Sequence, residues 1–199
     1  MVELAVLTAL VIILQLAGIG LRLPFLATPV SLVLIPITLG AMILGPKAGA
    51  WLGFVFGMIV FVSCGVMGLD PFTAYLFQNN PVGTACICLF KSTLAGLISG
   101  LVFQAFVRGR HGNSLIAAIV SAALSPIINT GIFVIGCYIV SGTIQGYITS
   151  IPEIAGISVT YFVSILCAGL NFIFEFLLNL IVSPALHRIY DVVTKKLSA

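Results

Sequence analysis

Charged residues are scarce in this sequence. Only 7% of its 199 residues are Asp, Glu, Lys or Arg, whereas 61% are hydrophobic. A soluble domain carries about 25% charged residues, so the composition argues against an ordinary water-soluble protein. Several apolar stretches reach the roughly 20 residues that a helix needs to cross a bilayer. The sequence therefore predicts an all-α membrane protein with a single domain over residues 1–199.

The motifs of common enzyme families are also missing. There is no GxxxxGK[ST] phosphate loop, no HExxH and no GxSxG. The five cysteines lie in apolar contexts without metal-ligand spacing to a histidine, which favours a role as small apolar side chains. We therefore expect no catalytic residue, no metal and no cofactor. The small and scattered net charge of +3 gives no indication of nucleic-acid binding.

The apolar stretches predict a six-transmembrane-helix bundle. The first stretch has Glu3 where a signal peptide carries basic residues, so it is interpreted as a retained span. Gly45 and Pro46 mark a tight turn between the second and third spans. The predicted spans are residues 4–19, 30–44, 48–66, 82–107, 114–140 and 158–186, with longer connections at 22–29 and 68–81 and a loop around Pro152 and Glu153.

The basic residues predict the orientation of this bundle. Most of them fall on one side of a six-span arrangement, and only Arg22 falls on the other. Cytoplasmic loops are enriched in Lys and Arg, so both termini are predicted to be cytoplasmic and the two longer connections to face outward. The residues on the cytoplasmic side are Lys47, Arg108, Arg110, Arg188, Lys195 and Lys196.

Small residues recur at four-residue spacing on three of the predicted spans. A double GxxxG covers residues 49–57, and another GxxxG covers residues 96–100. This spacing forms a flat strip that lets another backbone approach closely, which favours packing within the bundle. Ala5 and Ala9 repeat the spacing at the cytoplasmic end of the first span. There, internal packing and docking to a different protein are equally open interpretations.

Two charged residues fall inside predicted spans, Lys91 in CLFKSTLAG and Glu175 in LNFIFEFLLNL. A charge at mid-bilayer costs at least about 2.5–3.5 kcal/mol, so both should face the bundle interior. One interpretation is a structural ion pair between them. The one we favour is a polar ligand pocket, because Asn129 and Asn171 lie at similar depths. Pro126, three residues before Asn129, either kinks the fifth span or opens space for that side chain.

The outward connection FTAYLFQNNP combines aromatic and amide side chains. Such residues suit a lid over a small polar molecule, and they also suit an aromatic belt at the membrane interface. We favour the lid, in which Tyr75, Gln78, Asn79 and Asn80 would contact the ligand.

Two segments resemble a known family. AVLTA near the start and LVLIPITLGAMILGPKAGAWLGFVFGM look like the substrate-binding S component of energy-coupling factor (ECF) vitamin transporters, and the LGPKAGAxLGFxFG turn is the most specific part. The resemblance implies a multi-pass protein of a bacterial plasma membrane that captures a vitamin from outside. It also implies an energising module, made of an EcfT-like membrane protein and two ATPases. Ala5 and Ala9 match the family's docking motif.

The resemblance also indicates a vitamin. SPIINTGIFVIGCYI, Lys91 and LNFIFE look most like the members assigned to pantothenate, in which Arg is more common at the position of Lys91. Lys91 would neutralise the carboxylate of pantothenate, and Asn129, Asn171 and the loop amides would take its hydroxyl and amide groups. Glu175 would hold Lys91 or accept from a hydroxyl. The alternatives are an S component for riboflavin, pyridoxine, folate or niacin, and, with less support, a self-sufficient secondary carrier.

Overall fold

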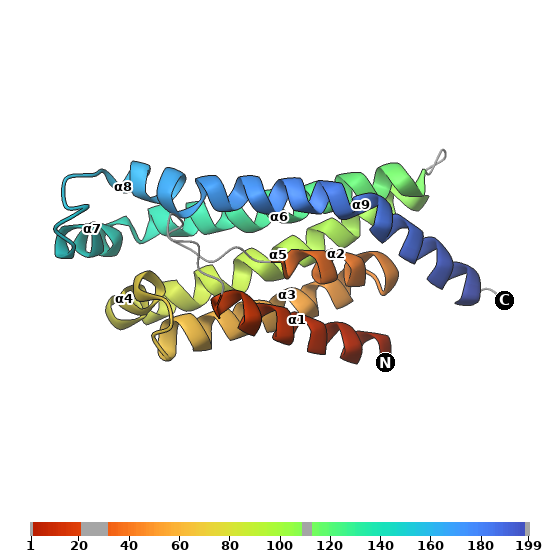
Figure 1. The fold of residues 1–199 in the computed structure, drawn as a ribbon, viewed down its shortest axis with the longest axis horizontal. Coiled ribbons are helices and arrows are strands. Elements are labelled where there is room, and N and C mark those ends of the chain that lie inside the picture. Colours follow the sequence, from red (N-terminus) through yellow and green to blue (C-terminus); the bar gives the residue numbers. More distant parts are fainter. Residues whose placement is uncertain (1, 21–31, 109–112, 198–199) are drawn as a thin grey trace.

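The computed structural model describes residues 2–20, 32–108 and 113–197, and all regular structure within them is helical (Figure 1). Two of the helices are interrupted by a π-helical turn, labelled η. The elements in order are α1 (Val2–Gly20), α2 (Leu34–Ile43), α3 (Pro46–Val60), η1 (Phe61–Val66), α4 (Pro71–Asn79), α5 (Pro81–Arg108), α6 (Ser114–Ile139), α7 (Ser141–Ser150), α8 (Val159–Tyr161), η2 (Phe162–Cys167) and α9 (Gly169–Leu197).

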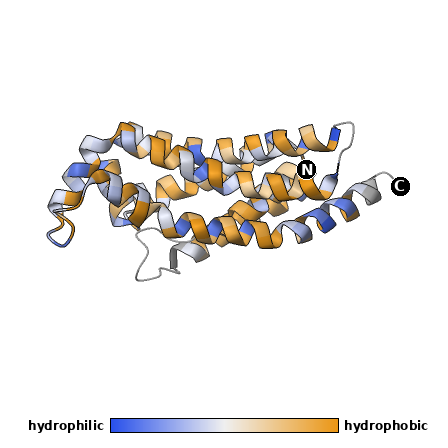
Figure 2. Cartoon of the chain, turned by 90° about the horizontal axis from the view of Figure 1, so that it is seen from above, coloured by the Kyte–Doolittle hydropathy of each residue, from blue (hydrophilic) through white to orange (hydrophobic). Residues whose placement is uncertain are grey.

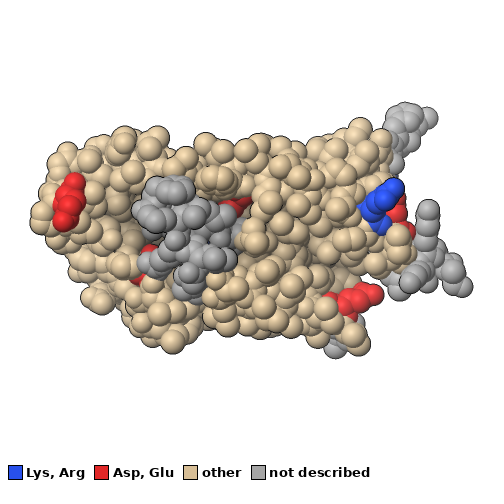
Figure 3. Space-filling model, viewed as in Figure 1, with Lys and Arg blue, Asp and Glu red and all other residues tan. Residues whose placement is uncertain are grey.

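Four segments of the described chain are long and apolar enough to cross a membrane: Pro46–Val66, Pro81–Arg108, Ser114–Ile139 and Val159–Thr194. Apolar residues cover most of their length, and hydrophilic residues gather toward the end of α9 (Figure 2). On the face drawn in Figure 3, charged side chains are few and lie mostly toward the two ends of the molecule. The chain is therefore a multi-pass helical membrane protein. α1 and α2 are apolar but shorter than the four candidate spans. The count of six spans and the cytoplasmic location of the termini therefore remain predictions.

Two segments expected to be loops contain helices instead. Residues 68–81 include α4, because Asp70 caps its first turn and Pro71 follows at the first helical position. The Asp70 carboxylate accepts from the Thr73 amide at 2.9 Å. After α6 the chain forms α7 before the loop around Pro152. The predicted connection at 22–29, with Arg22, lies outside the described residues, as does Arg110.

The predicted turn between the second and third spans is confirmed. Gly45 has a φ of 96°, a left-handed conformation that glycine adopts without steric cost, and Pro46 starts α3 immediately after it. The turn folds α3 back along α2, and both helices pack with α5.

The glycine strip of α3 packs against α5, which confirms the interpretation of internal packing. A Cβ added at Gly57 would lie 2.5 Å from the Cys88 carbonyl oxygen, and one at Gly53 would collide with the Ser92 carbonyl. The two backbones are therefore in direct contact along the strip, as small residues allow between membrane helices. α4 and α7 lie at the opposite end of the bundle from the N- and C-terminal ends of the chain (Figure 1).

Candidate functional site

A cavity lies inside the bundle beneath α4. It encloses about 920 Å³ of space without atoms, including its opening. Residues of α1, α3, α4, α5, α6 and α9 line it, together with both π-helical turns. The extra residue of a π-turn widens a helix locally and often marks a functional site. Each π-turn contributes one cysteine to the wall, Cys64 from η1 and Cys167 from η2.

Four of the predicted site residues converge on this cavity from three spanning helices. They are Lys91 on α5, Asn129 on α6, and Asn171 and Glu175 on α9. Glu175 is only 1% exposed and Asn129 only 7%. Sequence reasoning therefore placed these side chains toward the bundle interior correctly, as the cost of a polar group in lipid requires.

The charged groups of the cavity are held by different contacts. The Lys91 ammonium lies over the Phe133 ring, 5.1 Å from the ring centroid, a distance at which a cation is attracted to the aromatic face. Asn171 Nδ2 donates to Glu175 Oε1 at 3.3 Å. Within the described chain, no ion pair joins Lys91 directly to Glu175. The side chains of Lys91 and Glu175 instead both line the cavity.

The four residues predicted for the lid do not line the cavity. Asn79 Nδ2 donates to the Tyr75 carbonyl at 2.8 Å, and Asn80 Oδ1 accepts from the Gly83 amide at 2.9 Å at the start of α5. Gln78 is exposed. These contacts account for the local structure of α4 and its junction with α5, and a role in ligand binding stays a prediction for all four.

Helix α4 nevertheless covers the cavity through other residues. Phe72, Thr73 and Leu76 line the wall, and Thr73 Oγ1 donates to the Asp70 carboxylate at 2.6 Å. Asp70 itself lines the cavity and is only 3% exposed. Sequence reasoning missed it, although Asp before Pro is a helix-start signal that would have placed it at the beginning of a helix.

Two further polar lining residues were missed. Gln15 is the one uncharged amide in the apolar first helix, and Thr84 lies one turn into α5. Both are buried. A polar side chain at an interior position of an apolar helix was the available signal for Gln15, by the same argument that identified Asn129.

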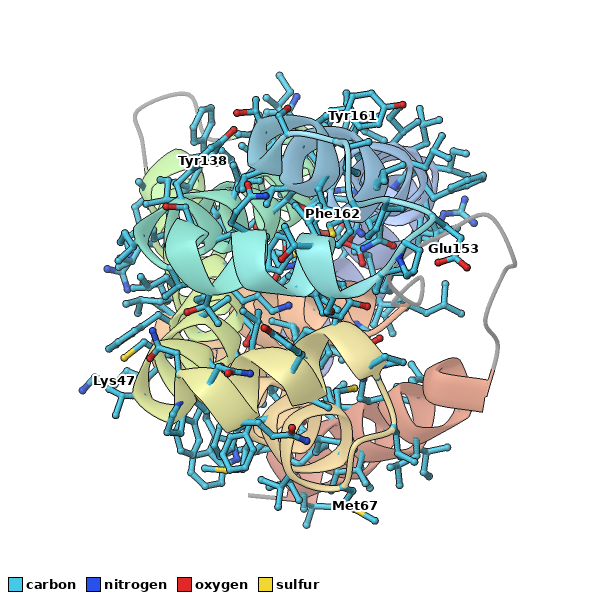
Figure 4. The ribbon with its side chains drawn as sticks, turned by 90° about the vertical axis from the view of Figure 1, so that its left-hand side faces the viewer. Lys47, Met67, Tyr138, Glu153, Tyr161 and Phe162 are labelled. Carbon is cyan, nitrogen blue, oxygen red and sulfur yellow. The ribbon has the colours of Figure 1, made fainter. Side chains whose placement is uncertain are left out.

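An aromatic cluster packs above the cavity at the end where α4 meets α7. Tyr147 of α7 contacts Phe72, Tyr75 and Phe162, with ring centroids 5.2–5.8 Å apart. Figure 4, seen from this end, shows Phe162 inside the ring of helices and Tyr161 at its edge. Burial raises the pKa of the Tyr147 phenol, and the Asp70 carboxylate raises it further, so the phenol stays neutral at physiological pH.

Ala5 and Ala9 lie at a different place, on the outer surface of α1. Both are exposed, and together with Thr8, Ile12 and Trp51 they line a shallow apolar groove between α1 and α3. The strip therefore faces away from the bundle. This position is compatible with contact to another membrane helix, and the docking role remains a prediction.

Comparison with known proteins identifies the family. The model of the family described as "ECF transporter, substrate-specific component" matches residues 1–187, which is most of the chain. The searches of curated proteins and of solved structures gave no match. Because the family model covers well over half of the chain and every described residue of the cavity, the chain belongs to the family of substrate-specific components of ECF transporters.

Proposed function

We propose that this chain captures a water-soluble vitamin in the cavity beneath α4, with pantothenate as the first candidate, and delivers it by docking to an ATP-driven energising module. Family membership makes the chain a substrate-binding subunit of a transporter and not an enzyme. The observation that carries the proposal is the convergence of Lys91, Asn129 and Glu175 on one cavity. Ionisable residues inside a membrane bundle mark ligand or ion sites by default, because burying them is costly.

The chemistry of the cavity suits pantothenate. This vitamin is a carboxylate anion that carries two hydroxyls and an amide. The Lys91 ammonium would pair with the carboxylate, while the Asn129 and Asn171 amides and the Glu175 carboxylate would bond to the hydroxyl and amide groups.

The proposal includes a topology. α1 and α2 would complete six spans, with both termini in the cytoplasm of a bacterial cell and α4 and α7 at the outer face of its plasma membrane. The cavity would then open to the outside. Lys47 and Arg108, at the end of the bundle opposite α4, would face the cytoplasm, as basic residues generally do.

A panel of vitamins tests the binding proposal. The purified chain should show a higher thermal midpoint with one vitamin and no change with the others. Lys91→Ala should weaken pantothenate binding about 10- to 100-fold, because a hydrogen bond to a charged group contributes about 1.5–3 kcal/mol. Lys47→Ala, which changes an exposed lysine far from the cavity, is the matched control.

The panel also separates the alternatives. A response to riboflavin, pyridoxine, folate or niacin would replace pantothenate and keep the function. No response to any vitamin at saturating concentration would count against the binding proposal. Uptake into vesicles by this chain alone, without partner or ATP, would favour a self-sufficient carrier.

Docking is tested at the groove of α1. The partners are expected to be an EcfT-like membrane protein and two ATPases. Ala5→Trp combined with Ala9→Trp should abolish uptake in the assembled transporter and leave ligand affinity of the isolated chain unchanged, since the groove and the cavity share no lining residue. Val6→Trp with Leu10→Trp, exposed positions of α1 outside the groove, serves as the control. Uptake that survives the alanine-position variant would overturn the docking role.

A further inference from the structure

Polar residues continue along α6 and α9 from the cavity, which Asn129, Asn171 and Glu175 line, toward the ends of the helices at Ser114 and His187. The two helices run side by side (Figure 1), and the Ser114 hydroxyl lies 2.8 Å from His187 Nε2 near their inner ends. This contact fixes which residues share a level. An α-helix has about 3.6 residues per turn. Two, three and four turns from the contact between Ser114 and His187, each helix carries a polar residue at the same height along the bundle. The pairs are Ser121 with Asn179, Ser125 with Glu175, and Asn129 with Asn171.

All of these side chains are buried or partly buried, and several have unmet hydrogen-bonding capacity. Within the described chain, Ser125 Oγ, Asn129 Oδ1, Asn171 Oδ1 and Asn179 Oδ1 are buried without a hydrogen-bond partner. Buried polar atoms in native proteins are nearly always bonded, to protein or to ordered water. Asn129 and Asn171 line the cavity. Ser125 lies about one turn beyond Asn129, and Asn179 about one turn beyond the lining residue Glu175. The four atoms therefore point to an occupant that continues from the cavity toward Ser125 and Asn179.

The chemistry of these atoms defines the occupant. Asn179 already uses its amide nitrogen, which donates to the Glu175 carbonyl at 2.8 Å, so its side-chain oxygen has only acceptor capacity left. The Asn129 and Asn171 atoms are carbonyl oxygens as well, and these also can only accept. The group that satisfies them must supply O–H or N–H donors.

We propose that the substrate site extends below the cavity floor into a subsite at Ser125 and Asn179, which receives a hydrogen-bond-donating group. This inference rests on the proposed function, because the cavity above the subsite is the vitamin site. The donor is a hydroxyl or amide of the ligand itself, or a water that the subsite holds against the ligand. If the donor belongs to the ligand, the subsite selects ligands that carry a hydroxyl or amide at the end inserted toward α9. If a water fills the subsite, the ligand bonds to that water as a donor or as an acceptor.

Two substitutions test the subsite with pantothenate as the probe. Ser125→Ala and Asn179→Leu should each weaken binding about five- to tenfold, the effect of losing one net hydrogen bond. Ser63→Ala is the matched control, because this buried serine bonds to the Ile59 carbonyl of its own helix and does not line the cavity. If another vitamin is selected by the panel, that vitamin and its analogue lacking one donor take the place of pantothenate.

An analogue of pantothenate without its terminal hydroxyl separates the two sources of the donor. If the ligand hydroxyl enters the subsite, the analogue binds wild type more weakly but loses no further affinity in Asn179→Leu. If water fills the subsite and bonds to a different group of the ligand, the analogue and the substitution weaken binding independently. Unchanged affinity for the vitamin in both variants would overturn the subsite, whichever source is correct.

A measurement without ligand keeps this inference separate from the proposed function. If water occupies the subsite of the empty protein, Asn179→Leu removes a bonded amide and should not raise the thermal midpoint. A rise of about 2–4 °C would show that no water satisfies Asn179 in the empty protein and would overturn water as the source of the donor. In a protein that binds its vitamin, unchanged affinity in Ser125→Ala and Asn179→Leu overturns the subsite alone. Failure of the wild-type protein to bind any vitamin would instead overturn the proposed function.

Discussion

The α3–α5 pair and the α6–α9 pair both border the cavity, but their helices are held together by different chemistry. Between α3 and α5, glycines bring two backbones into direct contact, as at Gly49, where an added Cβ would lie 2.5 Å from the Gly96 carbonyl oxygen. On α6 and α9, buried or partly buried polar residues recur at four-residue spacing instead: Ser121, Ser125 and Asn129 on α6, and Asn171, Glu175 and Asn179 on α9. One interface is closed to any additional atom, whereas the other carries unsatisfied polar atoms.

The difference follows from what lipid allows. Apolar helices gain no hydrophobic energy by associating in a bilayer, so a stable contact needs either close van der Waals packing or hydrogen bonds. The glycine contact gives a rigid wall and positions Lys91, which lies on the same helix as Gly96. The polar residues of α6 and α9 place hydrogen-bonding groups beside the cavity. We infer that α3–α5 acts as the scaffold and α6–α9 as the selective wall.

The largest expected effect comes from breaking the glycine contact. Gly53→Ala should lower the thermal midpoint in detergent by roughly 5–10 °C, because its Cβ would collide with the Ser92 carbonyl and overpacking costs about 1–3 kcal/mol. A thiol-reactive dye suits the measurement in a Cys86→Ser background, because Cys86 is exposed whereas Cys64, Cys88 and Cys137 are buried and react when the bundle opens.

Gly131→Ala in α6 is the matched control for that substitution. In the described part of the chain, no atom outside its own stretch of α6 lies within 4 Å of the position where its Cβ would be, and alanine favours a helix over glycine by about 1 kcal/mol. Its midpoint should therefore be equal or higher. Equal losses in the two variants would contradict the view that only the α3–α5 interface is closed.

The scaffold was largely predictable from sequence, because its signals are local. Gly45 and Pro46 specify a turn through their own backbone preferences, and the glycine spacing of residues 49–57 defines one face of a helix. The inward orientation of Lys91 and Glu175 was predictable for a related reason, because a charged side chain on an apolar membrane helix is stable only when it faces the bundle interior.

The roof of the cavity was not predictable in the same way. Whether Tyr75 or Phe72 reaches the cavity depends on the rotation of α4 above the bundle, which is set by its packing against Tyr147 of α7. That contact joins residues more than 70 positions apart. The level of Asn179 relative to Ser121 similarly became clear only from the contact between Ser114 and His187.

A smaller effect is expected at Ser121, which is bonded within the polar region. Its hydroxyl donates to the Ser99 carbonyl of α5 at 2.8 Å and is fully buried. Ser121→Ala should lower the thermal midpoint by about 2–4 °C, the shift for about 1 kcal/mol in a chain of this size. A midpoint equal to that of wild type would show that α5 and α6 pack without help from this hydrogen bond.

The smallest effect is expected at Ser99, one residue whose hydroxyl has no hydrogen-bond partner in the described part of the chain. Ser99→Ala should leave the midpoint unchanged or raise it by about 1–2 °C, because removing an unsatisfied buried hydroxyl ends its desolvation cost and alanine favours the helix. Ser99→Ala keeps the backbone carbonyl that accepts from Ser121. Comparing Ser99→Ala with Ser121→Ala therefore distinguishes the contribution of the Ser99 hydroxyl from that of the hydrogen bond to the Ser99 carbonyl. A loss as large as that of Ser121→Ala would mean that the Ser99 hydroxyl is bonded in the membrane, and water would then reach deeper between the helices than the subsite at Ser125 and Asn179.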